Sequence, residues 1–109
     1  MIYFVRTAKV APLSGKESWE FAKKSAKYVK EKYPNASMEM LTRMSGKQDE
    51  IVWVMKFESL TAYEEFYKQL GNDEGYNKLI EELMKAEEKK GRPFLAEGMI
   101  DTYYRTVDL

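Results

Sequence analysis

The chain has 109 residues, with 18 Lys plus Arg, 18 Asp plus Glu and a formal net charge of zero. This length fits one domain with a real core, and a balanced charge gives no reason to expect nucleic acid as a partner. Cysteine and histidine are both absent. Their absence excludes disulfides, thiolate nucleophiles, most zinc sites, the common haem ligand and the usual general base, so we expect neither a metal nor a cofactor.

The N-terminal stretch 1–13 gives no sign of a targeting segment. It carries Arg6 and Lys9 within its apolar residues, and no apolar run approaches the ~20 residues that span a bilayer. We therefore expect no membrane association and a cytoplasmic location.

The first half of the chain predicts a strand, a helix and a second strand. The first strand covers Ile2–Val10 and stops near Pro12, which has no N–H for a ladder. Ser14 and Glu17 have the spacing of a capping box, and an apolar stripe then recurs at three and four residues until Pro34. The stripe comprises Trp19, Ala22, Ala26, Val29 and Tyr33. A second strand is expected over 37–45, with Met38, Met40 and Met44 on one face.

The second half predicts a hairpin, a broken helix and a last strand. Residues 46–49 form a short loop into a third strand, Glu50–Phe57. Ser59 or Thr61 caps the next helix, which Gly71 to Asp73 interrupts and which then resumes until Gly91 and Pro93. The final strand is expected over 99–107, with 94–98 as a connector that could pair weakly with an edge.

These elements define an α+β fold. The order βαββαβ is a ferredoxin-like doubled split unit, in which a four-stranded antiparallel sheet carries its helices on one face. Right-handed crossovers place the first and third strands centrally and the second and fourth at the edges.

Three of the four strands are apolar on both faces, whereas the helices can cover only one. We expect a homodimer, in which a second copy covers the other face and encloses a space between the sheets. Our assignment puts Tyr3, Val5, Thr7, Val52, Val54, Ile100, Thr102 and Tyr104 under the helices. It leaves Phe4, Arg6, Trp53, Met55, Asp101, Tyr103 and Arg105 on the face toward the partner, and these seven are our candidate ligand-binding residues. The alternative is an inverted parity, because a bulge moves every later side chain to the other face.

Arginine is the candidate anchor of this site. A planar guanidinium tolerates partial burial and holds a carboxylate with two hydrogen bonds, so Arg6 or Arg105 could bind an acidic ligand. The competing interpretation, which we favour, is a structural ion pair of one of them with Asp101 or Glu39. The strand methionines could line an adaptable pocket, but ordinary core packing is the stronger interpretation.

The sequence also resembles a known family. The opening Ile2-Tyr3-Phe4-Val5-Arg6-Thr7 with Gly15-Lys16, the segment Phe57-Glu58-Ser59-Leu60 leading to Phe66, and Asp73-Glu74-Gly75-Tyr76 look like the NIPSNAP-like branch of the dimeric alpha-beta barrel superfamily. The resemblance implies that residues 1–109 form a single dimeric alpha-beta barrel domain. The superfamily includes cofactor-independent monooxygenases of antibiotic biosynthesis and haem-handling enzymes. This chain lacks the histidine of the haem branches, and its asparagines fall outside the expected strands.

Three functions follow from these observations. The leading one is a homodimer that binds a small apolar or aromatic molecule, acidic or not, between its sheets, with an undefined role. The second is a monooxygenase-like enzyme, for which Asp101 or Glu39 would have to accept a proton. The third is a structural or interaction module whose interior is filled by side chains.

Overall fold

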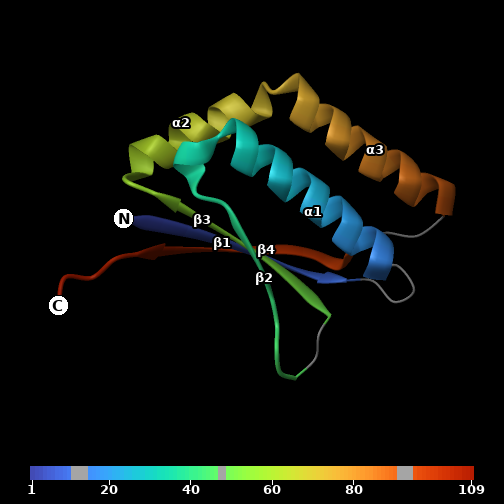
Figure 1. The fold of residues 1–109 in the computed structure, drawn as a ribbon, viewed down its shortest axis with the longest axis horizontal. Helices are drawn as coiled ribbons and strands as arrows, with labels where there is room; N and C mark the ends of the chain where they lie inside the picture. The colour runs from blue at the N-terminus through green and yellow to red at the C-terminus, as the bar shows by residue number, and fades with distance from the viewer. Residues whose placement is uncertain (11–14, 47–48, 91–94) are drawn as a thin grey trace.

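The computed structural model describes residues 1–10, 15–46, 49–90 and 95–109, without the side chains at 90 and 95–98. The described elements confirm the predicted α+β class and chain order (Figure 1). They are β1 (Ile2–Val10), α1 (Gly15–Lys32), the short 3-10 helix η1 (Pro34–Ala36), β2 (Glu39–Thr42), β3 (Glu50–Phe57), α2 (Leu60–Gly71), α3 (Glu74–Lys90) and β4 (Leu95–Arg105).

The four strands form one antiparallel sheet in the order β2-β3-β1-β4, as predicted. Helices α1, α2 and α3 all lie on one side of this sheet, and none of the described helices lies on the opposite face (Figure 1). Helices α1 and α3 run antiparallel to each other along the covered side, while α2 leads into α3 at a short break.

Local signals explain most of the helix and strand ends. The Ser59 side chain accepts a hydrogen bond from the Ala62 N–H, so Ser59 rather than Thr61 caps α2. The predicted cap at Ser14 lies outside the described residues. Strand β2 is shorter than predicted, and Met44 beyond it is 93% exposed. Strand β4 begins at 95, so part of the expected connector belongs to the sheet.

The predicted face assignment is wrong on all three strands to which it was applied, β1, β3 and β4, and in the same sense on each. Phe4, Ile51, Met55 and Phe57 are buried on the side of the helices, together with α1 and α2 side chains. Residues that were predicted to share a face do share one. Each of the two sets, however, lies on the opposite face of the sheet from the one predicted. The helix side carries Phe4, Arg6, Trp53, Met55, Asp101, Tyr103 and Arg105, and the open side carries Tyr3, Val5, Thr7, Val52, Val54, Ile100, Thr102 and Tyr104.

The reason lies in the size of the helix residues. The buried positions of α1 are all small or medium, namely Ser18, Ala22, Ala26 and Val29. A close-packed interior leaves few voids, so small helix residues require large strand residues beneath them. The compact Val and Thr side chains are left to the open face.

Candidate functional site

A cavity of about 300 Å³ lies between the sheet and the helices. Its floor is formed by Phe4, Arg6, Trp53 and Met55 of β1 and β3, with Met38 and Met99 toward the two edges. The helices close it from above with Ser18, Phe21, Ala22, Ser25, Ala26, Val29, Phe66, Tyr67, Leu70, Gly71, Tyr76, Asn77, Ile80 and Leu83. This volume is at the lower end of the range for small-molecule sites, and the mainly apolar lining with a few polar groups is typical of them.

The structure brings most of the predicted site residues together, but beneath the helices rather than between two sheets. Phe4, Arg6, Trp53 and Met55 line the cavity. Asp101 contacts Arg6 from β4, so it belongs to the same cluster. An inter-sheet cavity walled by these side chains is therefore wrong, because all of them face α1, α2 and α3.

The two outermost candidates on β4 lie beside the cavity. The Tyr103 ring packs against that of Phe4, with ring centroids 5.2 Å apart. Arg105 lies opposite Ile2 at the end of β4 and is exposed, outside the described lining. Of the two arginines proposed as anchors, only Arg6 is in position.

Arg6 forms the ion pair that we had favoured as a structural interpretation. Its Nε donates to Asp101 Oδ1 over 2.7 Å and its Nη2 donates to Asp101 Oδ2 over 3.0 Å. These hydrogen bonds raise the pKa of Arg6 further above its ordinary value, and the Tyr67 hydroxyl adds to the effect, although partial burial opposes it. The guanidinium is therefore charged at every physiological pH. The structural ion pair with Asp101 is present and Arg6 also lines the cavity, while its role as an anchor for an acidic ligand stays a prediction.

The cavity floor places an aromatic ring next to this cation. Arg6 and Trp53 are direct cross-strand partners, and Arg6 also lies 5.3 Å from the centroid of the Phe4 ring. Facing side chains on paired strands have Cβ atoms about 5 Å apart. A planar ligand on Trp53 would thus have its edge within reach of a guanidinium.

Methionine contributes to both the core and the cavity. Met38 and Met55 are buried members of the core cluster, as the stronger interpretation required, and they also line the cavity with Met99. Unbranched thioether chains repack easily around guests of different shape. The methionine side chains of the floor can therefore adjust to a ligand, whereas Arg6 is held in place by Asp101.

Tyr63 of α2 connects the helices with the edge strand β4. The hydroxyl groups of Tyr63 and Tyr103 are 3.0 Å apart, and their rings meet edge to face. Burial, followed by the hydrogen bond with Tyr103, raises the pKa of Tyr63 well above its ordinary value. One turn later, Tyr67 stacks near Tyr63 and lines the cavity beside Arg6.

The candidate site residues predicted from the sequence all lie on strands and include no helix residue. Tyr67, Tyr76 and Asn77 are therefore absent from that prediction. All three line the cavity from α2 and α3. One sequence feature could have indicated them: the hydroxyl groups of Tyr67 and Tyr76 lie within helix stripes that are otherwise apolar.

A buried carboxylate ties α1 to the start of α3. The Asp73 side chain is 1% exposed, accepts hydrogen bonds from the Tyr28 and Tyr33 hydroxyls at 2.7 and 2.6 Å, and lies 2.8 Å from Lys32 Nζ. Asp73 also accepts the Tyr76 N–H at 3.0 Å. Burial alone would raise the pKa of Asp73, but these donors outweigh it and hold the pKa well below its usual range. We refer to Asp73, Tyr28, Tyr33 and Lys32 as the Asp73 cluster.

The described residues offer little for metal or base chemistry. Among them, no group of three or more acidic side chains is placed to hold a metal ion. Of the two strand carboxylates named as possible bases, Asp101 is engaged by Arg6, and Glu39 pairs with Val54 of the open face, 4.0 Å from Lys56 Nζ. Both carboxylates therefore lie beside a basic side chain.

Comparison with known proteins places the fold. No family model and no curated protein matches the sequence. Among solved structures, a NIPSNAP domain protein from Burkholderia xenovorans is similar, with a TM-score of 0.75, 12% identity and coverage of 98% of this chain and 95% of that one. A NIPSNAP family protein from Agrobacterium tumefaciens gives a TM-score of 0.73 and 13% identity, covering 98% of this chain and 86% of its own.

A Nitrosomonas europaea structure named as an antibiotic biosynthesis monooxygenase gives a TM-score of 0.70 and 10% identity, with 99% of this chain and all 100% of the other covered. The chain therefore has the ferredoxin-like α+β fold of the NIPSNAP and monooxygenase proteins, which is the branch that its sequence resembles. At these identities the likeness concerns the fold and carries no activity.

Within the described part of the chain, no helix has the length and apolar character needed to cross a bilayer.

Proposed function

We propose that this protein is a homodimer in which each protomer binds a small apolar or aromatic molecule in the cavity beneath its helices. The observation that carries the proposal is the cavity floor, where the Trp53 indole and the Arg6 guanidinium are cross-strand neighbours. The indole offers a surface for stacking, and the guanidinium offers hydrogen bonds to an acidic oxygen. An acidic group is therefore favoured in the ligand but is not required for binding.

Two fluorescent probes separate these contributions. Anilinonaphthalene sulfonate (ANS) carries an anionic group, and phenylnaphthylamine has the same rings without it. We expect both probes to bind with a molar ratio of one per protomer. We expect Arg6→Gln to weaken ANS binding about tenfold, or about 1.4 kcal/mol, with little change for phenylnaphthylamine.

The matched control for this variant is Arg6→Gln combined with Asp101→Asn, which removes both charges of the pair. Its ANS affinity should lie between those of the wild type and the single variant, because the unpaired Asp101 carboxylate no longer repels the sulfonate. Equal ANS affinity for the wild type and both variants would contradict the anchor role of Arg6. Failure of either probe to bind would remove the ligand-binding proposal.

The dimer part of the proposal rests on the open face of the sheet. Its centre is apolar, with Val5 between Val54 and Thr102 in one row and Thr7 between Val52 and Ile100 in the next. Charged residues flank this centre, namely Glu39, Lys56, Lys9 and Glu50. An apolar centre with a polar rim is typical of a protein interface, and the face is complementary in character to a second copy of itself.

A further inference from the structure

The helices that cover the cavity differ in how closely they pack against the sheet. Helix α1 covers the sheet with buried residues such as Ala22 and Val29. Helix α3, in contrast, faces the cavity with Ile80 and Leu83, which are only half-buried. The apolar side of α3 is therefore packed at Leu79, which is buried, and borders the cavity at Ile80 and Leu83.

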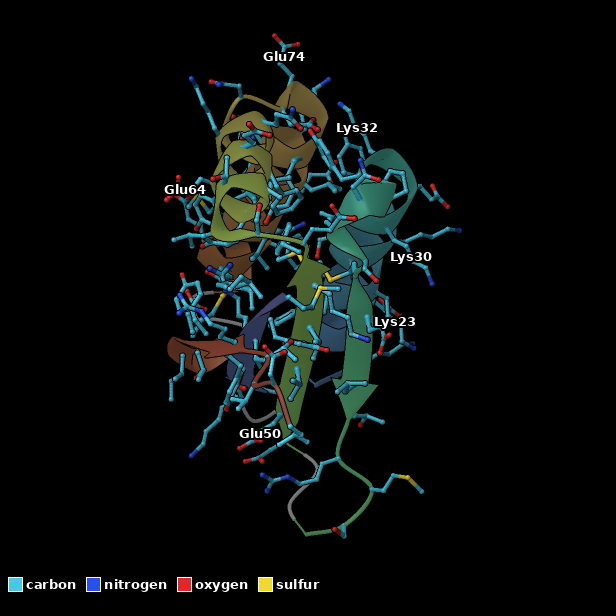
Figure 2. The ribbon with its side chains drawn as sticks, turned by 90° about the vertical axis from the view of Figure 1, so that its left-hand side faces the viewer. Lys23, Lys30, Lys32, Glu50, Glu64 and Glu74 are labelled. Atoms are coloured by element: carbon cyan, nitrogen blue, oxygen red, sulfur yellow. The ribbon has the colours of Figure 1, made fainter. Side chains whose placement is uncertain are left out.

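The first turn of α3 is firmly held. Asp73 precedes the helix and joins it to α1 through the Asp73 cluster, while the Asn77 N–H donates to the Asp73 carbonyl over 2.9 Å. Gly75 packs closely against Tyr28, so that a Cβ at this position would collide with the Tyr28 ring and hydroxyl unless Tyr28 moved. Figure 2 shows Lys32 at this end of α1 and Glu74 at the start of α3. A buried carboxylate with several donors is costly to separate from them.

Farther along α3, an exposed ion pair joins this helix to α1. There Lys24 Nζ of α1 lies 3.1 Å from Glu82 Oε2 of α3, and both side chains are 61% exposed. An ion pair of this exposure contributes between zero and about 1 kcal/mol. This ion pair is therefore cheaper to break than the buried contacts of the Asp73 cluster.

Two residues lie between the cavity and an outer groove at this part of α3. Phe21 of α1 and Leu83 of α3 line the inner cavity, and both also line an outer groove between the helices, together with Lys24 and Glu82. Displacing Leu83 would join the two spaces.

We propose that α3 is a hinged lid, which pivots at the Asp73 cluster and opens a passage between Phe21 and Leu83 into the cavity. The Lys24–Glu82 ion pair spans the mouth and closes it reversibly. The lid rests on the proposed function, because it would control access to the proposed ligand site. Its movement can nevertheless be tested without a ligand. Opening of a weakly held helix end against a fixed end is a local fluctuation of the kind that lids use.

The test uses Trp53 as a reporter of entry. Trp19→Phe leaves Trp53 as the only tryptophan, and acrylamide then quenches its fluorescence as it reaches the cavity. Because the chain has no cysteine, Lys24→Cys with Glu82→Cys can be joined by a short bis-maleimide that ties α3 to α1 across the mouth. We expect this link to lower the quenching rate constant about threefold or more.

The matched control carries Lys27→Cys and Glu31→Cys, two exposed positions one turn apart on α1, joined by the same reagent. It should quench as the unlinked protein does, while Leu83→Ala should quench faster. Equal quenching of the two linked proteins would overturn the lid, as would slower quenching of Leu83→Ala. If ANS does not bind but the link across the mouth still slows quenching, the proposed function fails and the lid remains.

Discussion

Arg6 and Asp101 lie opposite each other on β1 and β4, and their bidentate ion pair forms one side of the cavity floor. Their side chains are 26% and 33% exposed, so water and solutes can compete for the guanidinium. A ligand with an acidic oxygen would compete with Asp101 for the hydrogen bonds of Arg6, because this guanidinium is already paired. The pair thus limits how strongly the site attracts an anion.

Asp101→Asn should therefore strengthen the binding of an acidic ligand. Removing the competing carboxylate leaves Arg6 with its full charge uncompensated, and a partly exposed ion pair is worth up to about 1 kcal/mol. We expect ANS to bind about threefold to fivefold more tightly, as measured by fluorescence titration. Phenylnaphthylamine, which has no sulfonate, is the control and should bind unchanged. Weaker ANS binding by Asp101→Asn would show that the ligand does not use Arg6.

The Asp73 cluster predicts an acid-sensitive contribution to stability. The folded-state pKa of Asp73 lies below the unfolded value of about 3.9, so its stabilising contribution is complete above that pH and is lost as pH falls through the folded pKa. Asp73→Asn should lower the free energy of unfolding at neutral pH by about 2–4 kcal/mol. The difference from the wild type should shrink below about pH 4.

Urea unfolding at several pH values measures this effect. Glu74→Gln is the matched control, since Glu74 is the adjacent acidic residue and is exposed. It should change stability little at any pH. A constant gap between Asp73→Asn and the wild type from neutral pH to pH 2 would contradict the assigned pKa shift.

Two glycines near the α2–α3 break provide a paired test of packing. A Cβ at Gly75 would collide with the Tyr28 ring and hydroxyl, whereas one at Gly71 would meet no atom within 4 Å. We expect Gly75→Ala to destabilise by about 1–3 kcal/mol, because Tyr28 must leave Asp73 to make room. Gly71→Ala should be neutral or stabilising by up to about 1 kcal/mol, since it replaces a helical glycine. Thermal unfolding of both variants decides the point, and equal losses would contradict this packing.

The open face of the sheet predicts a variant that separates the protomers. Val54 lies at the apolar centre of that face, so Val54→Lys would place a charge in the proposed interface. Native mass spectrometry at micromolar concentration should give the mass of two chains for the wild type and of one for Val54→Lys. Glu64→Lys, on the outer side of α2 (Figure 2), introduces the same residue away from the interface and should remain dimeric. A monomeric wild type would contradict the dimer.

The sequence predicts the elements and the strand order because alternation and helix periodicity are local signals. The same alternation separates Phe4, Arg6 and Trp53 from Val5 and Val54 correctly as sets. It does not say which set lies under the helices when both are apolar. The small stripe of Ala22 and Ala26 contains that information, since it requires large strand residues beneath it.

The cavity could not be predicted from the periodicity of the sequence. It lies between strand residues and Ile80 and Leu83 of α3, and the start of α3 is joined to α1 by the Asp73 cluster. Contacts between residues 40 or more positions apart, such as Tyr33 with Asp73, leave no periodic trace. The helix side of the site is therefore visible only in the folded chain.

The methionine methyl groups provide the most direct test of the cavity as the ligand site. Met38, Met55 and Met99 line it, whereas Met44 is 93% exposed at the β2 end. In a spectrum of methyl-labelled methionine recorded during titration with ANS, the account predicts saturable shifts of the three cavity methyls and none for Met44. Unmoved cavity methyls at a saturating probe concentration, or shifts confined to Met44, would contradict it.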